Sequence, residues 1–236
     1  MYDLAVTEAL WRLTEPGETA VDVGANIGYM TSVLASRVGT KGTVYAFEPH
    51  PEIHQELLEN LGRWRSTMRS GEIRASPLAL SSACGTAMLW CDDYFTVNRG
   101  TASLIMRSPA SSGTTVDVGT LDTCLRDERR IGVLKLDVEG AELSVLLGAG
   151  DLLRRHAIRD IVFEGHEQYR RPVFTLLAEA GYAIFRLSKG HTRPLLSEPG
   201  ATERVPRWGA PSYLATLDAE RSRRLFSARG WKCLSG

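Results

Sequence analysis

The sequence predicts an α/β fold in which helices cover both faces of a mostly parallel, doubly wound sheet of seven strands. Short apolar runs alternate with segments of helical periodicity along most of the chain. The stretch 19–31, TAVDVGANIGYMT, has the pattern of a strand, a tight glycine turn and a helix start. The nearly continuous apolar run VLKLDV at 133–138 is typical of a central parallel strand that is covered on both faces. These observations favour a fold built from repeated strand–helix units.

The expected elements follow one another along the chain. Strands of the main sheet are expected at 20–23, 43–47, 72–75, 133–138, 160–163, 182–187 and 213–217, and two further strands at 86–90 and 114–118. Helices are expected at 3–13, 27–38, 51–61, 139–150, 169–180 and 220–229.

The first three helices are predicted from apolar residues at helical spacing, and turn-forming residues mark where these helices begin or end. Pro16-Gly17 closes the first helix, Gly39 to Gly42 closes the second, and Pro51 suits the first turn of the third. The apolar positions are Leu4, Ala9, Leu10 and Leu13, then Ile27, Met30, Leu34 and Val38, then Ile53, Leu57, Leu58 and Leu61.

Length and composition suit one domain over residues 1–236, with 43% hydrophobic and 24% charged residues. The zero net charge counts against a nucleic acid or an anionic membrane as the main partner. No window reaches the roughly 18 continuous apolar residues of a membrane span. We therefore expect a small-molecule acceptor as the partner, and a homodimer is left open.

The cysteines show neither a C-x-x-C pair nor zinc spacing, and no basic-then-apolar leader precedes the first strand. We therefore expect a reduced, cytoplasmic protein without a structural metal. The cysteines are Cys84, Cys91, Cys124 and Cys233.

Two segments interrupt the alternation of predicted strands and helices. Residues 91–118 are rich in Gly, Ser, Thr and Asp, and we expect them to form a β-flap that faces the substrate, with a solvated loop as the alternative. Tyr94, Phe95 and Arg107 are its candidate substrate-binding residues. Residues 188–212 are expected to form an irregular connection near the cleft, where Trp208 is a further aromatic candidate.

The glycine turn favours S-adenosylmethionine (SAM) over a dinucleotide. Its order, D-x-G-x-N-x-G, has Asn26 where the dinucleotide pattern has the glycine that makes room for a pyrophosphate. The helix start is expected to offer unpaired N–H groups to a small anionic ligand. Glu48 follows Gly24 by about twenty residues, where an acid binds a ribose in doubly wound folds. Leu78 and Ala79 are candidates for an adenine pocket, with a plain apolar turn as the alternative.

Acidic side chains gather at the expected carboxyl edge of the sheet. Lys135 and Asp137 share one face of strand 133–138, because side chains alternate along a strand. Such charges should be paired or should lie at the edge where ligands bind. Glu142 falls in the first turn of the next helix, where an acid suits the helix dipole, so a structural role is favoured for it. Glu164 and His166 follow strand 160–163.

In order, the segments VDVGANIG, AFEPHP, TLDTCL, LKLDVEGAELSVLLGA and IVFEGHE resemble the FkbM-type family of SAM-dependent methyltransferases, a class I, Rossmann-like group. The resemblance covers roughly residues 17–187, and KLDVEGAE is its most specific part. It implies methylation of hydroxyl groups on sugars or polyketide-derived natural products, with S-adenosylhomocysteine (SAH) as the second product. On this resemblance the SAM-binding residues are Asp22, Gly24, Ala25, Asn26, Gly28, Glu48 and Pro49, and Asp137, Glu139 and Glu164 lie near the reacting centre.

In-line displacement at the methyl carbon depends mainly on holding the acceptor oxygen in line. A base that takes the hydroxyl proton adds about 10²- to 10⁴-fold. Asp137 and His166 are the candidate bases, and Lys135 is expected to be an electrostatic anchor for Asp137. Glu164 is expected to be the orienting partner of the base or a hydrogen-bond acceptor for a neighbouring sugar hydroxyl.

Three alternatives remain open on the sequence. In the first, a divalent metal held by Asp137, Glu139, Glu164 and His166 would polarise the acceptor hydroxyl. In the second, the chain is a non-catalytic domain that binds SAM or a nucleotide sugar, since fold alone does not determine function. A methyltransferase that acts on a macromolecule is the third.

Overall fold

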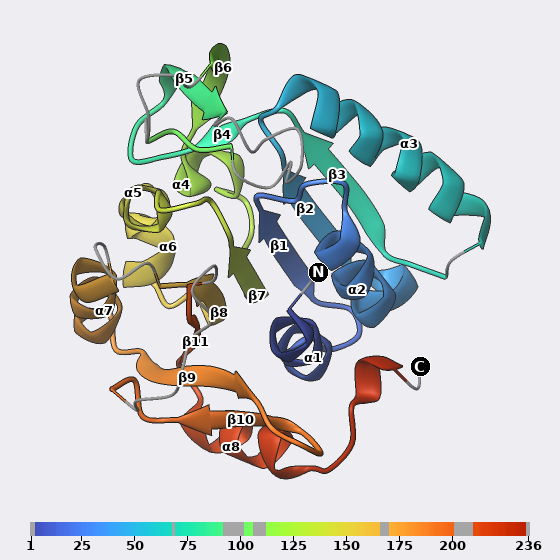
Figure 1. The fold of residues 1–236 in the computed structure, drawn as a ribbon, viewed down its shortest axis with the longest axis vertical. Coiled ribbons are helices and arrows are strands. Elements are labelled where there is room, and N and C mark those ends of the chain that lie inside the picture. The colour runs from blue at the N-terminus through green and yellow to red at the C-terminus, as the bar shows by residue number, and fades with distance from the viewer. Residues whose placement is uncertain are drawn as a thin grey trace.

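The computed structural model describes residues 3–67, 69–91, 102–105, 112–165, 170–200 and 210–234. Within these ranges a large sheet of eight strands forms the centre of the molecule (Figure 1). Its strands are β1 (Thr19–Val23), β2 (Thr43–Phe47), β3 (Glu72–Ser76), β7 (Ile131–Leu136), β8 (Ile158–Glu164), β9 (Ala183–Lys189), β10 (Pro194–Ser197) and β11 (Ser212–Thr216).

The strand order is β10-β9-β11-β8-β7-β1-β2-β3. The five strands from β8 to β3 are parallel to their neighbours, whereas β11 is antiparallel to both β8 and β9, and β10 is antiparallel to β9. The predicted α/β fold with a mostly parallel sheet is therefore confirmed.

The sheet has one strand more than predicted. Part of the segment 188–212, predicted as an irregular connection, forms β10, which pairs with Arg186 to Lys189 in a hairpin. Pro194 is tolerated at its first position because β10 is an edge strand with a partner on one side only. The prolines of this segment obscured a strand of only four residues.

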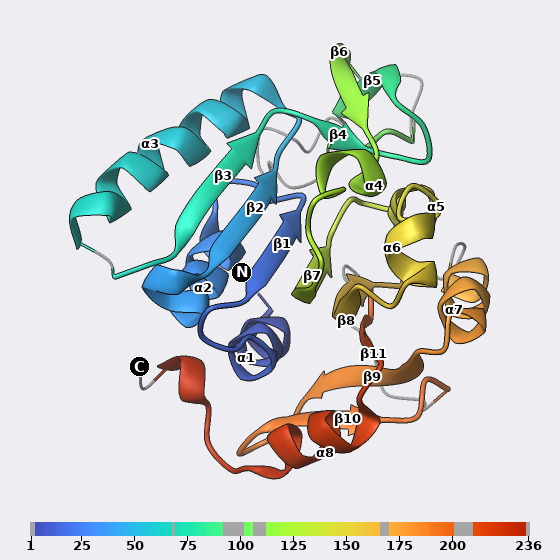
Figure 2. The same cartoon turned by 180° about the vertical axis from the view of Figure 1, so that it is seen from behind.

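Helices cover both faces of the sheet (Figures 1 and 2). Residues of α1 (Leu4–Leu13), α2 (Tyr29–Val38) and α8 (Ala219–Ser227) pack on one face, with α3 (Pro51–Thr67) beside α2. Residues of α4 (Leu121–Cys124), α5 (Glu142–Leu147), α6 (Gly150–Arg154) and α7 (Arg170–Glu179) pack on the other face. Two short 3-10 turns are η1 (Gly39–Lys41) and η2 (Lys232–Leu234).

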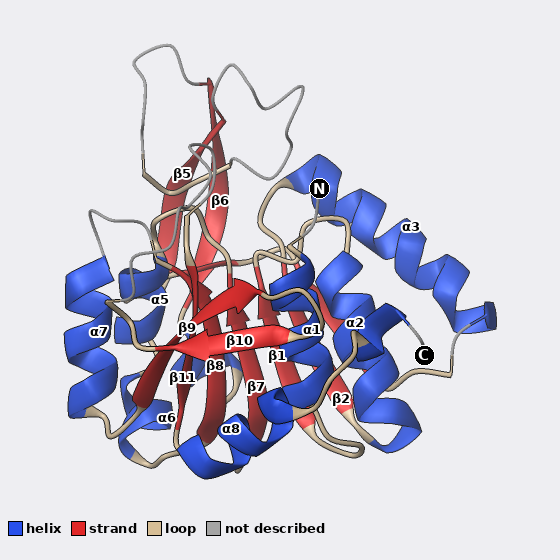
Figure 3. Cartoon of the chain, turned by 60° about the horizontal axis from the view of Figure 1, so that its bottom comes forward, coloured by secondary structure: helices blue, strands red, loops and turns tan. Residues whose placement is uncertain are grey.

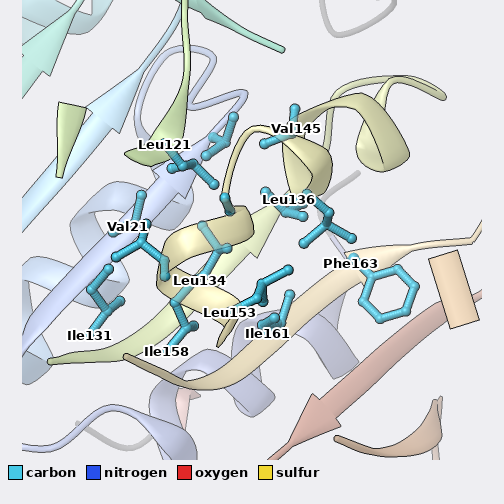
Figure 4. Packing of buried hydrophobic residues seen from close by; sticks show 14 of the residues in the cluster. Val21, Leu121, Ile131, Leu134, Leu136, Val145, Leu153, Ile158, Ile161 and Phe163 are labelled. Carbon is cyan, nitrogen blue, oxygen red and sulfur yellow. The ribbon is translucent and has the colours of Figure 1, made fainter. Parts of the chain in front are cut away.

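The central strand β7 is buried along its whole length, as the sequence predicts. Leu134 and Leu136 point into the cluster under α4 to α7, together with Val21 and Phe163 (Figure 4). Val133 packs into the opposite cluster, with residues of α1 and α2. Apolar side chains are therefore needed at successive positions, and a charged residue in this strand requires a buried partner.

A second sheet of three strands forms an insertion between β3 and β7. It consists of β4 (Ala79–Leu80), β5 (Gly85–Cys91) and β6 (Ser112–Gly119), in the order β4-β6-β5, and it extends away from the main sheet (Figure 3). We call this sheet the flap. Its strands β5 and β6 match two predicted strands, whereas the short β4 was not predicted.

Several candidate residues lie outside the described part of the chain. They are Tyr94, Phe95 and Arg107 of the flap insertion, together with His166 and Trp208.

Over the described residues, no helix combines the length and the apolar character needed to cross a membrane. All four cysteines lie within the described ranges, and each is a free thiol.

Candidate functional site

The order of the strands creates a switch point beside β1. The chain runs from β1 outward to β2 and β3 and then returns to β7 on the other side of β1. In open α/β sheets, ligands bind outside the carboxyl ends of the strands at such a point. Here it brings together the turn after β1, residues 24–28, and the loop after β7, residues 137–141.

Gly24 lies against the loop after β7. Its φ is +75°, in the left-handed region, and a Cβ atom added there would lie 1.9 Å from the main-chain oxygen of Asp137. The N–H group of Asp137 in turn donates to the oxygen of Val23 at 3.1 Å. Only glycine satisfies both the conformation and the close approach, so this residue sets the distance between the two loops.

The N–H groups of the turn itself, residues 24–28, all have acceptors within the protein. The N–H groups of Gly24 and Ala25 both donate to the oxygen of Phe47, at 3.0 and 2.9 Å. Those of Asn26 and Ile27 donate to the carboxylate of Glu48 and to the side-chain oxygen of Asn26, and that of Gly28 donates to the oxygen of Ala25. The prediction of N–H groups for an anionic ligand concerns the start of α2, which begins at Tyr29, and it stays a prediction.

Glu48 joins the end of β2 to the glycine turn. Its Oε2 accepts from the N–H group of Asn26 and its Oε1 from that of His50, each at 2.9 Å. Burial raises the pKa of Glu48, and these two N–H groups offset part of that rise. Each carboxylate oxygen retains acceptor capacity for another donor, such as a hydroxyl of a ribose. The neighbouring Pro49 is half-buried.

Other residues of the turn support its shape. Asn26 has a left-handed φ of +50°, which asparagine tolerates better than most residues do. Ala25 is buried against α3, and a Cβ atom at Gly28 would lie 2.6 Å from Leu57 of the same helix. The turn is thus packed between α3 and the sheet.

A buried ion pair connects β1 to β7. The ammonium of Lys135 lies 3.0 Å from Oδ1 of Asp22 and donates to the main-chain oxygen of Gly24 at 2.8 Å. Asp22 is fully buried, and its Oδ2 accepts from the hydroxyl of Thr31 at 2.6 Å. Asp22 therefore contributes to the site from beneath the glycine turn.

Lys135 also reaches the carboxyl edge, where its Nζ lies 3.6 Å from Oδ2 of Asp137. The predicted anchoring of Asp137 is present, but Asp22 is the nearer partner. Burial by itself lowers the pKa of Lys135, but the carboxylates of Asp22 and Asp137 outweigh it and raise the pKa above its usual value. Lys135 is therefore a cation held between the turn and the edge.

Carboxyl groups from two strand ends gather at this edge. Burial, followed by the charges of Asp137 and Glu139, raises the pKa of Glu164 to about 8. The side chain of Asp137 is 41% exposed, so it is accessible to a ligand. Within the described ranges, no three His, Cys, Asp or Glu residues are arranged to hold a metal ion.

Glu142 has the structural role that the sequence favours. It lies in the first turn of α5 and is 1% exposed, and its Oε1 accepts from the N–H group of Gly140 at 3.2 Å. It therefore stabilises the loop between β7 and α5.

The two adenine candidates lie at the base of the flap. Ala79 is buried with Leu89 and Val116 of the flap, and Leu78 packs against the main core. Their contact with an adenine stays a prediction.

Two contributors to the site were not identified from the sequence. Thr31 lies on α2, three and four residues before the buried Leu34 and Ala35, so a hydroxyl on a buried helix face was a detectable signal. The hydroxyl of Ser103 donates to the main-chain oxygen of Glu139 at 2.9 Å. No periodicity in the segment around Ser103 could have indicated this contact.

Comparisons with known proteins agree with this geometry. Residues 22–184 match the family model described as the methyltransferase FkbM domain. The chain is similar to methyltransferase sdnD of Sordaria araneosa, with 30% identity over 199 residues that cover 70% of this chain and 74% of that protein. It is also similar to the hexuronic acid methyltransferase AglP of Haloferax volcanii, with 28% identity over 185 residues, 74% of this chain and 67% of that protein.

A solved structure shares the fold. The methyltransferase FkbM from Methylobacillus flagellatus KT matches with a TM-score of 0.54 and 19% identity, over 84% of this chain and 43% of that one. The chain thus spans less than half of that structure. The match of the family model over most of the chain, together with the sdnD similarity, shows that the chain belongs to the FkbM methyltransferase family.

Proposed function

We propose that this protein is a SAM-dependent O-methyltransferase that transfers a methyl group to a hydroxyl of a small molecule, of the sugar or polyketide type, by in-line displacement. The observation that carries the proposal is the position of Lys135, whose ammonium contacts both the oxygen of Gly24 and the carboxylates of Asp22 and Asp137. A ligand resting on the glycine turn would therefore lie directly beside the acidic edge.

The residues of the turn suit SAM. Asn26 stands where a dinucleotide site has the glycine that makes room for a pyrophosphate, so a ligand without a pyrophosphate fits better. The carboxylate of Glu48 has acceptor capacity for ribose hydroxyls. SAM, when bound, supplies the activated methyl group. The protein's own contribution would then be to orient the acceptor oxygen and to accept its proton.

Two carboxyl groups suit different parts of this task. Asp137 is accessible, and the ammonium of Lys135 holds it at the edge, so it is positioned to contact the acceptor hydroxyl and accept its proton. Glu164, with a pKa of about 8, carries a proton at neutral pH and is suited to donate a hydrogen bond to an acceptor oxygen. His166 lies outside the described residues and stays a second candidate base.

A sugar acceptor is supported by the relative AglP, which is named a hexuronic acid methyltransferase. Glu139 lies next to this edge and suits hydrogen bonding to a neighbouring hydroxyl of a polyhydroxylated acceptor.

The test is methyl transfer from labelled SAM to a panel of glycosides, hexuronic acids and polyketide alcohols. We expect transfer to a hydroxyl of at least one compound and a loss of about 10²-fold or more in Asp137→Asn. Lys189→Met, which removes an exposed lysine at the end of β9, is the control and should retain activity. Transfer to amines alone would overturn the O-methyl proposal, and full activity of Asp137→Asn would overturn the role of Asp137.

A further inference from the structure

Ser103 joins the flap to the acidic edge. It forms a β-bridge with Trp90 of β5, in which the N–H group of Trp90 donates to the oxygen of Ser103 at 2.8 Å and that of Ser103 donates to the oxygen of Trp90 at 2.9 Å. Its hydroxyl accepts from the N–H group of Ile105 at 3.1 Å and donates to the oxygen of Glu139 at 2.9 Å. Ser103 is 2% exposed, so these bonds are shielded from water.

The peptide unit between Glu139 and Gly140 is held at both of its polar groups. Its oxygen accepts from the hydroxyl of Ser103, and its N–H group donates to the carboxylate of Glu142 at 3.2 Å. Rotation of this peptide plane would break both bonds. Ser103 and Glu142 therefore determine its orientation from opposite sides.

This restraint matters because Glu139 has an unfavourable backbone conformation. Its φ is +54°, in the left-handed region, which is sterically unfavourable for a residue with a side chain. Such conformations persist where the surrounding structure enforces them, and they are concentrated at functional sites. This conformation makes Glu139 a candidate for a functional residue.

We propose that Ser103 is a positioning residue of the acceptor site: by holding the 139–140 peptide, it directs the carboxylate of Glu139 toward the edge formed by Asp137 and Glu164. The inference rests on the proposed function, because it assigns this edge to the acceptor. Through the hydroxyl of Ser103, the flap then becomes part of the acceptor site. The acceptor is then expected to carry a second polar group, which binds the carboxylate of Glu139, near the hydroxyl that is methylated.

The charge of Glu139 provides a readout that is independent of activity. It contributes to the raised pKa of Glu164, together with Asp137 and Glu142, whereas Lys135 opposes the rise. If the 139–140 peptide turns, the Glu139 carboxylate moves and the pKa of Glu164 falls. A role of Ser103 limited to holding the flap would leave that pKa unchanged.

The experiment compares Ser103→Ala with Thr115→Ala. Thr115 lies on β6, is exposed, and donates its hydroxyl to the sulfur of Met88, so its loss removes a flap hydroxyl that does not contact the edge. The titration of Glu164 is followed by NMR on protein with isotope-labelled glutamate, with Glu164→Gln to assign the signal. Affinity for SAH is measured by calorimetry on the same samples.

We expect the titration midpoint of Glu164 to move to lower pH in Ser103→Ala and to stay in place in Thr115→Ala, with SAH affinity retained in both. With an acceptor from the panel, Ser103→Ala should raise KM on the order of tenfold, as expected for a lost hydrogen bond that positions a contact. Ser103→Cys replaces the hydroxyl with a thiol of the same shape, which is slightly larger and a weaker donor, and should give an intermediate shift. It answers the question if the alanine variant does not fold.

An unchanged midpoint in a folded Ser103→Ala or Ser103→Cys protein that still binds SAH would overturn the positioning role alone. Failure of the wild-type protein to bind SAH would instead reject the proposed function.

Discussion

Lys135 and Asp22 are register partners on the adjacent strands β7 and β1, and their charged atoms lie 3.0 Å apart in the interior. Lys135 is 4% exposed and Asp22 is fully buried. Neither charge has access to bulk water, so each depends on the other. Since Lys135 also contacts Gly24 and Asp137, this pair links the stability of the sheet to the geometry of the site.

Loss of either partner should therefore destabilise the fold strongly. We expect Lys135→Met and Asp22→Asn each to lower the free energy of unfolding by about 3–5 kcal/mol, because each leaves a buried group without its partner. The double variant Asp22→Asn/Lys135→Met should cost clearly less than the sum of the two. Chemical denaturation measures these changes, with Lys189→Met as the control for loss of an exposed lysine. Additive losses would show that the two charges do not depend on each other.

Comparing alanine substitutions at Gly24 and Gly17 separates the effect of backbone strain from the effect of a steric clash. Both have left-handed φ, +75° and +84°, but a Cβ atom at Gly17 would meet no atom within 4 Å, whereas at Gly24 it would meet the oxygen of Asp137. We expect Gly17→Ala to cost roughly 1–2 kcal/mol of unfolding free energy and to retain SAH binding. Gly24→Ala should cost more and abolish SAH binding, because the loops after β1 and β7 must separate. Equal losses in the two variants would contradict this role of Gly24.

The raised pKa of Glu164 predicts a pH-dependent stability. A carboxyl group with a pKa near 8 in the folded protein and about 4.3 in the unfolded chain is protonated more readily in the folded state. Its contribution is favourable at low pH and is lost as pH rises from about 4 to about 8. Glu164→Gln should therefore gain stability relative to the wild type as pH rises through this range.

Denaturation at several pH values between 5 and 9 measures that difference, with about 1.4 kcal/mol per pH unit as the upper limit of its slope. Glu179→Gln, which removes an exposed carboxylate at the end of α7, controls for loss of a surface charge. A constant difference between Glu164→Gln and wild type would contradict the raised pKa.

Glu48 should be needed for the cofactor more than for the fold. In Glu48→Gln one oxygen is replaced by an amide nitrogen, so the N–H group of Asn26 or His50 loses its acceptor and the ribose loses one as well. We expect SAH affinity to fall about tenfold or more and stability to fall by roughly 1–3 kcal/mol. Glu59→Gln, at an exposed ion pair with Arg63 on α3, should change neither by much. Calorimetry with SAH checks the first effect, and unchanged affinity would remove Glu48 from the cofactor site.

The central part of this fold was predictable because its signals are local. The apolar run of β7, the glycine turn after β1 and the acid at the end of β2 are each visible within a few residues. The same is true of Glu142, whose position in the first turn of a helix indicates its structural role.

What could not be predicted depends on neighbours that are distant in the chain. The period of a strand places Lys135 beside Asp137, but only the register between β7 and β1 places it beside Asp22. The acceptors at Phe47 and Glu48 that occupy the N–H groups of the turn come from β2. Edge strand β10 has too few residues for a pattern, and the bond from Ser103 to Glu139 connects an irregular segment to a loop.

The most direct test of the central claim is a calorimetric titration of the wild-type protein with SAH and, separately, with NAD. The claim that the glycine turn and Glu48 hold SAM predicts that SAH binds with one site per chain and that NAD gives no heat of binding. Binding of NAD without binding of SAH would contradict the claim.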